Sequence, residues 1–287
     1  MTESLAQRKF FTCLDTAALG IRVGFPEALR FAGEYGFEGL APKAGYLSEM
    51  GADGLHRQLA EQNLRWGSLR VPVNVNGDEP VYAEGMAGLA RWASMAEEAG
   101  VERTHMTLAA GSDELPRDEN FARHVERCNR ITSVLKDHRL SLGLEYVGPL
   151  EVRAGLRYPF VHTLPELVEL LGAVENHMGV VLDSFHWYTA GDSVADILAL
   201  SAEDVVSVDI NDAIAGLPRE DQEDLNRALP GATGVIDISG FLTALVRIGY
   251  AGPVCVEPFC KDLAGKPPDE VLTMTKKSID AVLPATG

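Results

Sequence analysis

The fold is best inferred from residues 179–213, GVVLDSFHWYTAGDSVADILALSAEDVVSVDINDA. Two short apolar runs, GVVLD and VVSVDI, flank the amphipathic segment SVADILALS at residues 193–201. Apolar runs of this length, bounded by polar residues, are typical of buried strands. Strands that alternate with helical segments indicate a parallel sheet. The stretch therefore predicts one strand–helix–strand unit of such a sheet.

The same unit recurs along the 287-residue chain. Apolar runs occur at residues 9–16, 37–43, 64–73, 103–110, 140–148, 179–187, 205–213 and 252–259. Helical segments are predicted at residues 26–36, 51–63, 82–100, 120–138, 163–174, 193–201 and 240–250. Glycines that favour a left-handed helix end stand at Gly36, Gly100 and Gly249. The pattern predicts an α/β protein, a (β/α)8 TIM barrel forming a single domain over residues 1–287.

The competing architecture is an open, doubly wound sheet. That fold usually carries a glycine-rich phosphate loop after its first strand. Residues 13–24, CLDTAALGIRVG, contain neither GxGxxG nor GxxxxGK[ST]. The closed barrel is therefore favoured.

Composition narrows the classes of partner. A formal net charge of −17 opposes binding to nucleic acid or to an anionic membrane. The cysteines are Cys13, Cys128, Cys255 and Cys260. They have neither the spacing of metal ligands nor the density of a disulfide framework. This favours a reduced, cytoplasmic setting. No signal peptide and no membrane-spanning run are expected.

Four acidic residues stand at the ends of the last four predicted strands: Glu145, Asp183, Asp209 and Glu257. In most of these strands the acid shares a face with small or polar residues, while bulky aliphatic residues occupy the other face. Barrel enzymes do their chemistry at the carboxyl ends of the strands, so the acids should converge there. Converging carboxylates need a cation, and oxygen ligands suit Mg²⁺ or Mn²⁺. The alternative is that each acid caps a helix or pairs with a nearby Lys or Arg.

His186 and Trp187 follow Asp183 in the run LDSFHW. Their place just beyond a strand end favours contact with a substrate, although packing under a loop is the simpler role for aromatic residues. His105, further back in its own strand, is a weaker candidate.

The chain resembles the xylose isomerase-like superfamily of sugar isomerases and epimerases. The resemblance is carried by LEYVGP, GVVLDSFHW, VDINDA, RALPG and IGYAGPVCVEPF, which begin at residues 144, 179, 208, 227 and 248. It implies one divalent metal, Mn²⁺ or Mg²⁺, bound at Glu145, Asp183, Asp209 and Glu257. It also implies that His186 and Arg227 contact the substrate, and Trp187 and Asp212 complete the predicted substrate site.

Residue 209 departs from the family pattern, which reads H-x-x-D in this strand. Here Asp209 replaces the histidine, while Asp212 stays in register. Asp209 can ligate the metal as a carboxylate, bind substrate or water instead, or mark the loss of metal binding. The strand alternation favours the first possibility, because it points Asp209 toward the other acids.

The resemblance implies an isomerase or epimerase acting on a small sugar or cyclitol. A metal-stabilised enediolate would form next to a ketone, with Glu145 and Glu257 as the acid–base pair. A keto-inositol (inosose) dehydratase-type lyase shares this first step, and a non-catalytic sugar-binding barrel is the other alternative. A metal nuclease is disfavoured by the net charge and by the lack of a histidine cluster. A homo-oligomer is possible, since related barrels often form dimers or tetramers.

Overall fold

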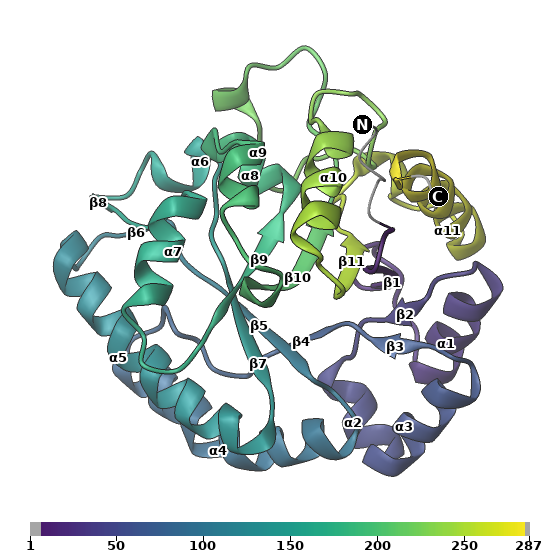
Figure 1. Cartoon of the computed structure of the whole chain (residues 1–287), viewed down its shortest axis with the longest axis horizontal. Coiled ribbons are helices and arrows are strands. Elements are labelled where there is room, and N and C mark those ends of the chain that lie inside the picture. Colours follow the sequence, from purple (N-terminus) through teal and green to yellow (C-terminus); the bar gives the residue numbers. More distant parts are fainter. Residues whose placement is uncertain (1–6, 285–287) are drawn as a thin grey trace, which may run out of the picture.

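Parallel strands form the centre of the computed structural model, which describes residues 7–284 apart from the side chains of residues 48–50 (Figure 1). The strands are β1 (Phe11–Leu14), β2 (Gly39–Leu40), β3 (Arg65–Trp66), β4 (Ser68–Arg70), β5 (Arg103–Thr107), β7 (Ser141–Glu145), β9 (Gly179–Asp183), β10 (Val205–Ile210) and β11 (Pro253–Val256). They pair in the order β3-β2-β1-β11-β10-β9-β7-β5-β4. A separate antiparallel pair joins β6 (Gly111–Ser112) to β8 (Tyr158–Pro159).

Gly67 joins the two edge strands of this sheet. β3 ends at Trp66 and β4 begins at Ser68, so both belong to one run of chain that closes the sheet into a barrel of eight strand positions. A Cβ atom at Gly67 would lie 2.8 Å from the Cys13 sulfur, too close for any larger residue. The predicted (β/α)8 barrel is confirmed, and the eight predicted strand runs are its strands.

Helices surround the barrel (Figure 1). They are α1 (Phe25–Glu34), α2 (Ala44–Met50), α3 (Ala52–Glu61), α4 (Glu79–Glu98), α5 (Arg117–Leu135), α6 (Leu150–Arg153), α7 (Leu164–Gly172), α8 (Ser184–Ala190), α9 (Val194–Leu198), α10 (Ile238–Ile248) and α11 (Pro268–Val282). Short 3-10 helices are η1 (Lys136–His138), η2 (Ala202–Asp204), η3 (Arg219–Asp221) and η4 (Lys261–Leu263). Among residues 7–284, no helix combines the length and apolar character needed to cross a membrane.

All seven predicted helical segments are confirmed, with shifts of a few residues at their ends and a shorter α9. Gly36, Gly100 and Gly249 have positive φ angles of 68°, 78° and 80°, as expected for helix ends. The sequence did not predict α2, α6, α8 or α11. Helix α8 was missed because it follows β9 without a loop: the Asp183 side chain caps it by accepting hydrogen bonds from the first amides.

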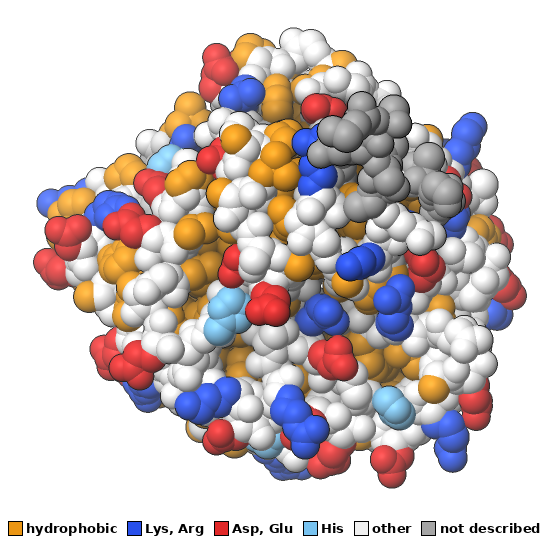
Figure 2. Space-filling model, viewed as in Figure 1, with side chains coloured by type: hydrophobic (Ala, Val, Ile, Leu, Met, Phe, Trp, Pro, Cys, Tyr) orange, Lys and Arg blue, Asp and Glu red, His pale blue; other side chains and the backbone are white. Residues whose placement is uncertain are grey.

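The core has two parts. The larger one lies between strands and helices, and a small cluster of Phe11, Cys13, Ala41 and Cys255 fills the barrel interior. Because strand residues alternate between these two sides, Asp209, opposite both Cys255 and Asp183 in the register, faces inward. The predicted strand parity is therefore correct. On the outside, acidic and basic side chains are interspersed over the face drawn in Figure 2.

Two buried histidines should make the barrel sensitive to acid. Burial lowers the pKa of His105 to about 3, helped by Arg70, and the pKa of His124 to about 4. Since the unfolded chain binds these protons near pH 6.5, stability should fall as pH drops below that value. Urea unfolding measures the free energy of unfolding at pH 7 and at pH 5. We expect His124→Gln to reduce the fall in this free energy between pH 7 and pH 5 by on the order of 1 kcal/mol. The control is His177→Gln, because His177 is exposed. An equal effect of both variants would contradict the attribution of the pH dependence to His124.

Candidate active site

The four predicted acids meet at the carboxyl end of the barrel. Glu145 and Asp183 are the last residues of β7 and β9, Asp209 lies near the end of β10, and Glu257 follows β11. Asp183 is fully buried, whereas the other three are partly accessible. The acids influence one another electrostatically: Glu257, Glu145 and Asp183 all raise the pKa of Asp209. The structure thus brings together all four carboxylates.

Asp183 is the best satisfied of the four. One of its oxygens accepts hydrogen bonds from the backbone amides of Phe185 at 2.6 Å and His186 at 3.2 Å. The other accepts from the Arg227 guanidinium at 2.8 Å, and the Asn211 amide lies 3.3 Å from both oxygens. Burial alone would raise the pKa of Asp183, but Arg227 above all lowers it below the usual range. Asp183 therefore stays ionised.

Arg227 provides the fixed positive charge of the site. Its side chain is 1% exposed, and it lies 2.8 Å from Asp183, 2.8 Å from Asp224 and 3.2 Å from Glu257. The guanidinium is held between the rings of Phe185 and Phe259, at 4.7 and 4.9 Å from their centroids. Burial would lower the pKa of Arg227, but the surrounding carboxylates outweigh burial and raise it.

One guanidinium does not neutralise four acids. Burial and the neighbouring acids raise the pKa of Glu257 and of Glu145, although Arg227 and His186 act in the opposite direction. Burial, Cys255 and the other acids raise the pKa of Asp209 well above its usual range. No residue among 7–284 donates a hydrogen bond or forms an ion pair with the Asp209 carboxylate. These surroundings favour the neutral, protonated form of Asp209 as long as no cation is bound.

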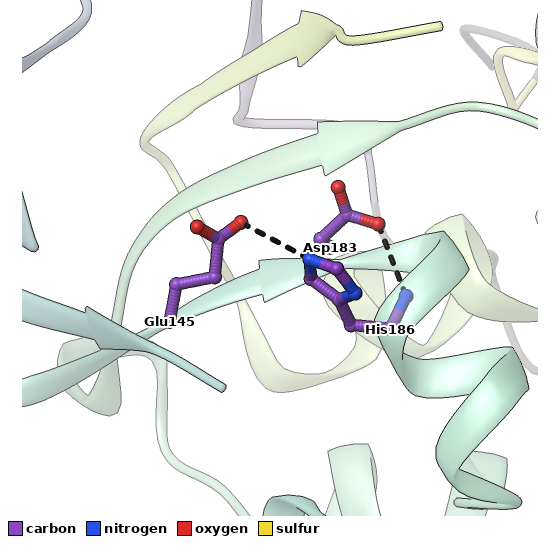
Figure 3. A group of neighbouring side chains, drawn as sticks. All are labelled: Glu145, Asp183 and His186. Carbon is purple, nitrogen blue, oxygen red and sulfur yellow. Dashed lines mark hydrogen bonds and ion pairs between the residues drawn. The ribbon is translucent and has the colours of Figure 1, made fainter. Parts of the chain in front are cut away.

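His186 lies beside Glu145 and Asp183, and Figure 3 shows the carboxylates of both acids turned toward it. Its Nε2 is 3.9 Å from Glu145, and its Nδ1 is 3.8 Å from Asp224. Glu145, Asp183 and His186 each offer one ligand atom, and these atoms lie within 4.8 Å of one another. This group of two carboxylates and one imidazole could hold a divalent cation.

Trp187 and Asp212 have contacts of a different kind. The Trp187 ring packs against Phe241 of α10 at 5.4 Å, and its Nε1 donates to the Ser193 carbonyl. The fully buried Asp212 carboxylate accepts hydrogen bonds from the backbone amides of residues 213, 233, 234 and 236. Within residues 7–284, no hydrogen bond or ion pair joins either side chain to the four acids. Their predicted contact with substrate stays a prediction. Trp187 links α8 to α10, and Asp212 stabilises the loop between β10 and α10.

Three polar residues of the site were not predicted from sequence. Asn211 donates to Asp183, Asp224 holds Arg227, and the Thr107 hydroxyl donates to Glu145 at 2.9 Å. The contact of Thr107 with Glu145 could have been predicted from the sequence, because Thr107 ends β5 and lies opposite Glu145 in the register. The contact of Asp224 with Arg227 could not have been predicted in this way, because Asp224 lies in the long loop between β10 and α10.

A cavity of about 640 Å³ lies at the carboxyl ends of β4 and β5, and its lining residues within 7–284 include none of the four acids. Thr107, which contacts Glu145, forms part of its wall, and Asn74, Asn76 and Arg70 supply further polar groups. Apolar residues such as Val73 and Leu156 line the rest. Its mixed lining and volume suit a small polyhydroxylated molecule.

Residues 29–280 match the family model described as xylose isomerase-like TIM barrel. The chain belongs to this family. Within it, the chain is 22% identical over 209 residues to inosose isomerase of Bacillus velezensis (strain DSM 23117 / BGSC 10A6 / LMG 26770 / FZB42); the match covers 72% of this chain and 71% of that relative. A second relative, inosose isomerase of Bacillus subtilis (strain 168), is 26% identical over 160 residues, only 55% of this chain and 54% of the relative.

Two solved structures of this fold align over nearly the whole chain. A xylose isomerase domain protein from Alicyclobacillus acidocaldarius is 26% identical, with a TM-score of 0.84 over 96% of this chain and 98% of that one. The IolI protein with a bound zinc atom is 20% identical, with a TM-score of 0.82 and the same coverage. The family and its relatives support a sugar isomerase or epimerase.

Proposed function

We propose that this protein is a divalent-metal-dependent isomerase or epimerase of a small sugar or cyclitol. The observation that carries the proposal is the inward Asp209, which lies among three further acids and has no cationic partner within residues 7–284. A cavity large enough for one such molecule is lined in part by Thr107, whose hydroxyl donates to Glu145. The relatives named inosose isomerase support a keto-inositol as the first substrate to test.

Glu145, Asp183, Asp209 and Glu257 would hold the metal, with His186 next to it. When bound, the cation would polarise a substrate carbonyl and so acidify the adjacent C–H group. Carboxylates favour hard ions, which supports Mg²⁺ or Mn²⁺, while the zinc in the IolI structure makes Zn²⁺ the ion to compare.

The chain's own residues would move the proton. Glu145 and Glu257 come from strand positions separated by β9 and β10, so they approach the centre of the barrel from different sides. One can remove the carbon-bound proton and the other return one to the opposite face, which inverts that carbon. Thr107 holds Glu145, and Arg227 holds Glu257, so both carboxylates are fixed in orientation. We expect Arg227 and His186 to bind substrate oxygens, as the family resemblance implies.

A deuterium-exchange screen tests the proposal. Ketoses, aldoses and keto-inositols are incubated in D₂O with the protein and Mn²⁺, and label uptake is measured by mass spectrometry. We expect label at one carbon next to the carbonyl of the true substrate. Loss of water from that substrate would assign the dehydratase-type reaction instead. Binding without label or product would indicate a non-catalytic sugar-binding barrel.

Asp209→Asn should separate metal binding from stability. Removing a carboxyl whose pKa is raised by burial should increase the stability of the metal-free protein. The same change should weaken Mn²⁺ binding about tenfold or more, because a charged ligand is lost. Calorimetric titration and the Mn²⁺-dependent shift in Tm measure the two effects. Asp137→Asn, an exposed substitution, is the control; unchanged Mn²⁺ affinity in Asp209→Asn would exclude residue 209 as a ligand.

A further inference from the structure

Two guanidinium groups with little compensating charge lie at the end of the barrel opposite the acids. Arg65 is the first residue of β3 and Arg103 the first of β5. Its backbone amide donates to the Glu38 carbonyl, but the Arg65 guanidinium forms no hydrogen bond or ion pair within residues 7–284. Its guanidinium instead lies over the Phe11 ring, 3.7 Å from the centroid. Stacking of this kind leaves the N–H edge of the guanidinium free for another partner.

The nearest acids do not neutralise this pair. Glu38 is engaged by Arg8 at 3.0 Å and by the amide and hydroxyl of Thr12. Glu102 lies 3.5 Å from Arg103, but its side chain is 78% exposed, so that pair is weak. Burial lowers the pKa of Arg65; Glu38 opposes this as the strongest charge effect, and Arg103 and Arg8 add to the lowering. Positive charges are thus gathered here in a chain whose net charge is −17.

A cavity of about 330 Å³ adjoins both guanidiniums. Its apolar wall contains Phe11, Leu64 and Trp66, and His56 of α3 also lines it. The exposed Glu102 carboxylate lines the cavity as well, next to Arg103. The Trp66 indole N–H already donates to the Ala99 carbonyl, so the ring offers the cavity mainly apolar surface. The cavity therefore combines a cationic side with a flat, apolar side.

We propose that this cavity binds a small organic anion, whose phosphate or carboxylate lies between Arg65 and Arg103. The planar guanidinium fork matches the oxygens of both groups. A flat, apolar body of the ligand would contact Phe11 and Trp66, and its burial would add affinity that an inorganic ion lacks. The site shares no residue with the acid cluster. The anion-binding proposal can therefore be tested independently of the proposed enzymatic function.

Calorimetric titration with phenyl phosphate tests the proposal, with inorganic phosphate and phenol as the two fragments. We expect one phenyl phosphate per chain, bound more tightly than either fragment and more weakly at about 0.5 M salt. Arg65→Gln and Arg103→Gln should each weaken binding roughly tenfold, because each removes a charge-assisted hydrogen bond. The affinity of Arg65→Lys for phenyl phosphate should lie between that of these variants and that of the wild type, because lysine keeps the charge but lacks the planar, bidentate guanidinium.

Arg139→Gln is the matched control, because this guanidinium lies in the neighbouring cavity on the same end and its side chain is 91% exposed. Its phenyl phosphate affinity should equal that of the wild type. Circular dichroism and Tm confirm that each variant is folded before titration. Affinity that survives in the folded Arg65→Gln/Arg103→Gln double variant would overturn the proposal. So would an affinity that falls in Asp209→Asn, because it would place the ligand at the acid cluster.

Discussion

Glu145→Gln and Glu257→Gln are each expected to slow solvent-proton exchange at the carbon next to the substrate's carbonyl by about 10²- to 10⁴-fold. Either change removes a group that accepts or returns the proton, while the amide keeps nearly the same shape. Burial and the neighbouring acids raise the pKa of both glutamates, which brings each closer to the range in which a carboxyl can exchange protons near neutral pH. Deuterium uptake into the substrate found by the screen measures the effect.

The two variants also differ from each other in an informative way. If each glutamate serves one face of the substrate, each variant should slow exchange in the epimer whose proton that glutamate removes, while epimerisation should stop in both variants. Glu169→Gln, on the exposed face of α7, is the control and should exchange like the wild type. Full exchange in both active-site variants would contradict the acid–base assignment.

Replacing Arg227 by Met should produce the largest loss of stability, about 3–5 kcal/mol in the metal-free protein. The change leaves the fully buried Asp183 without its positive partner, next to Glu257. Because Arg227 holds the pKa of Asp183 below 3.8, this stabilisation is fully present above that pH and is lost as pH falls through the lowered pKa. Urea unfolding at pH 7 measures the difference.

Added Mn²⁺ should restore part of this loss, because a cation bound at the acids supplies the missing charge. Arg227→Lys should be less destabilising than Arg227→Met, since it retains the charge without the bidentate geometry. The control is Arg139→Met, whose native guanidinium is almost fully exposed. A loss below about 1 kcal/mol in Arg227→Met would show that the acids are neutralised in another way.

The strand ends illustrate how far local sequence reasoning extends. Glu145, Asp183 and Glu257 end or follow apolar runs, and strand alternation alone placed Asp209 on the inner side. The helix that follows Asp183 was not predicted, because SFHWYTA has little apolar periodicity and its start depends on one capping side chain. Sequence thus predicts elements that repeat a pattern better than elements defined by a single contact.

The roles of the loop residues depended on the three-dimensional arrangement. Arg227 was predicted to contact substrate, yet its position between Asp183, Asp224 and Glu257 also makes it the internal counter-charge of the site. Asp212 was predicted to contact substrate, and its carboxylate also accepts hydrogen bonds from backbone amides of the same loop. Both arrangements are set by how residues 211–237 fold back on themselves, which no short-range pattern encodes.

By itself, the sequence determined the barrel, its family and the four acids at the strand ends, because hydrophobic periodicity and strand parity are local properties of the chain. Only the tertiary structure decided how charge is distributed among those acids. One guanidinium from a distant loop keeps Asp183 ionised, while Asp209 is left without a partner among the described residues. The same holds at the other end of the barrel, where Arg65 and Arg103 become neighbours because parallel strands begin at a common edge. Electrostatic interactions depend on distance in space rather than on separation in sequence.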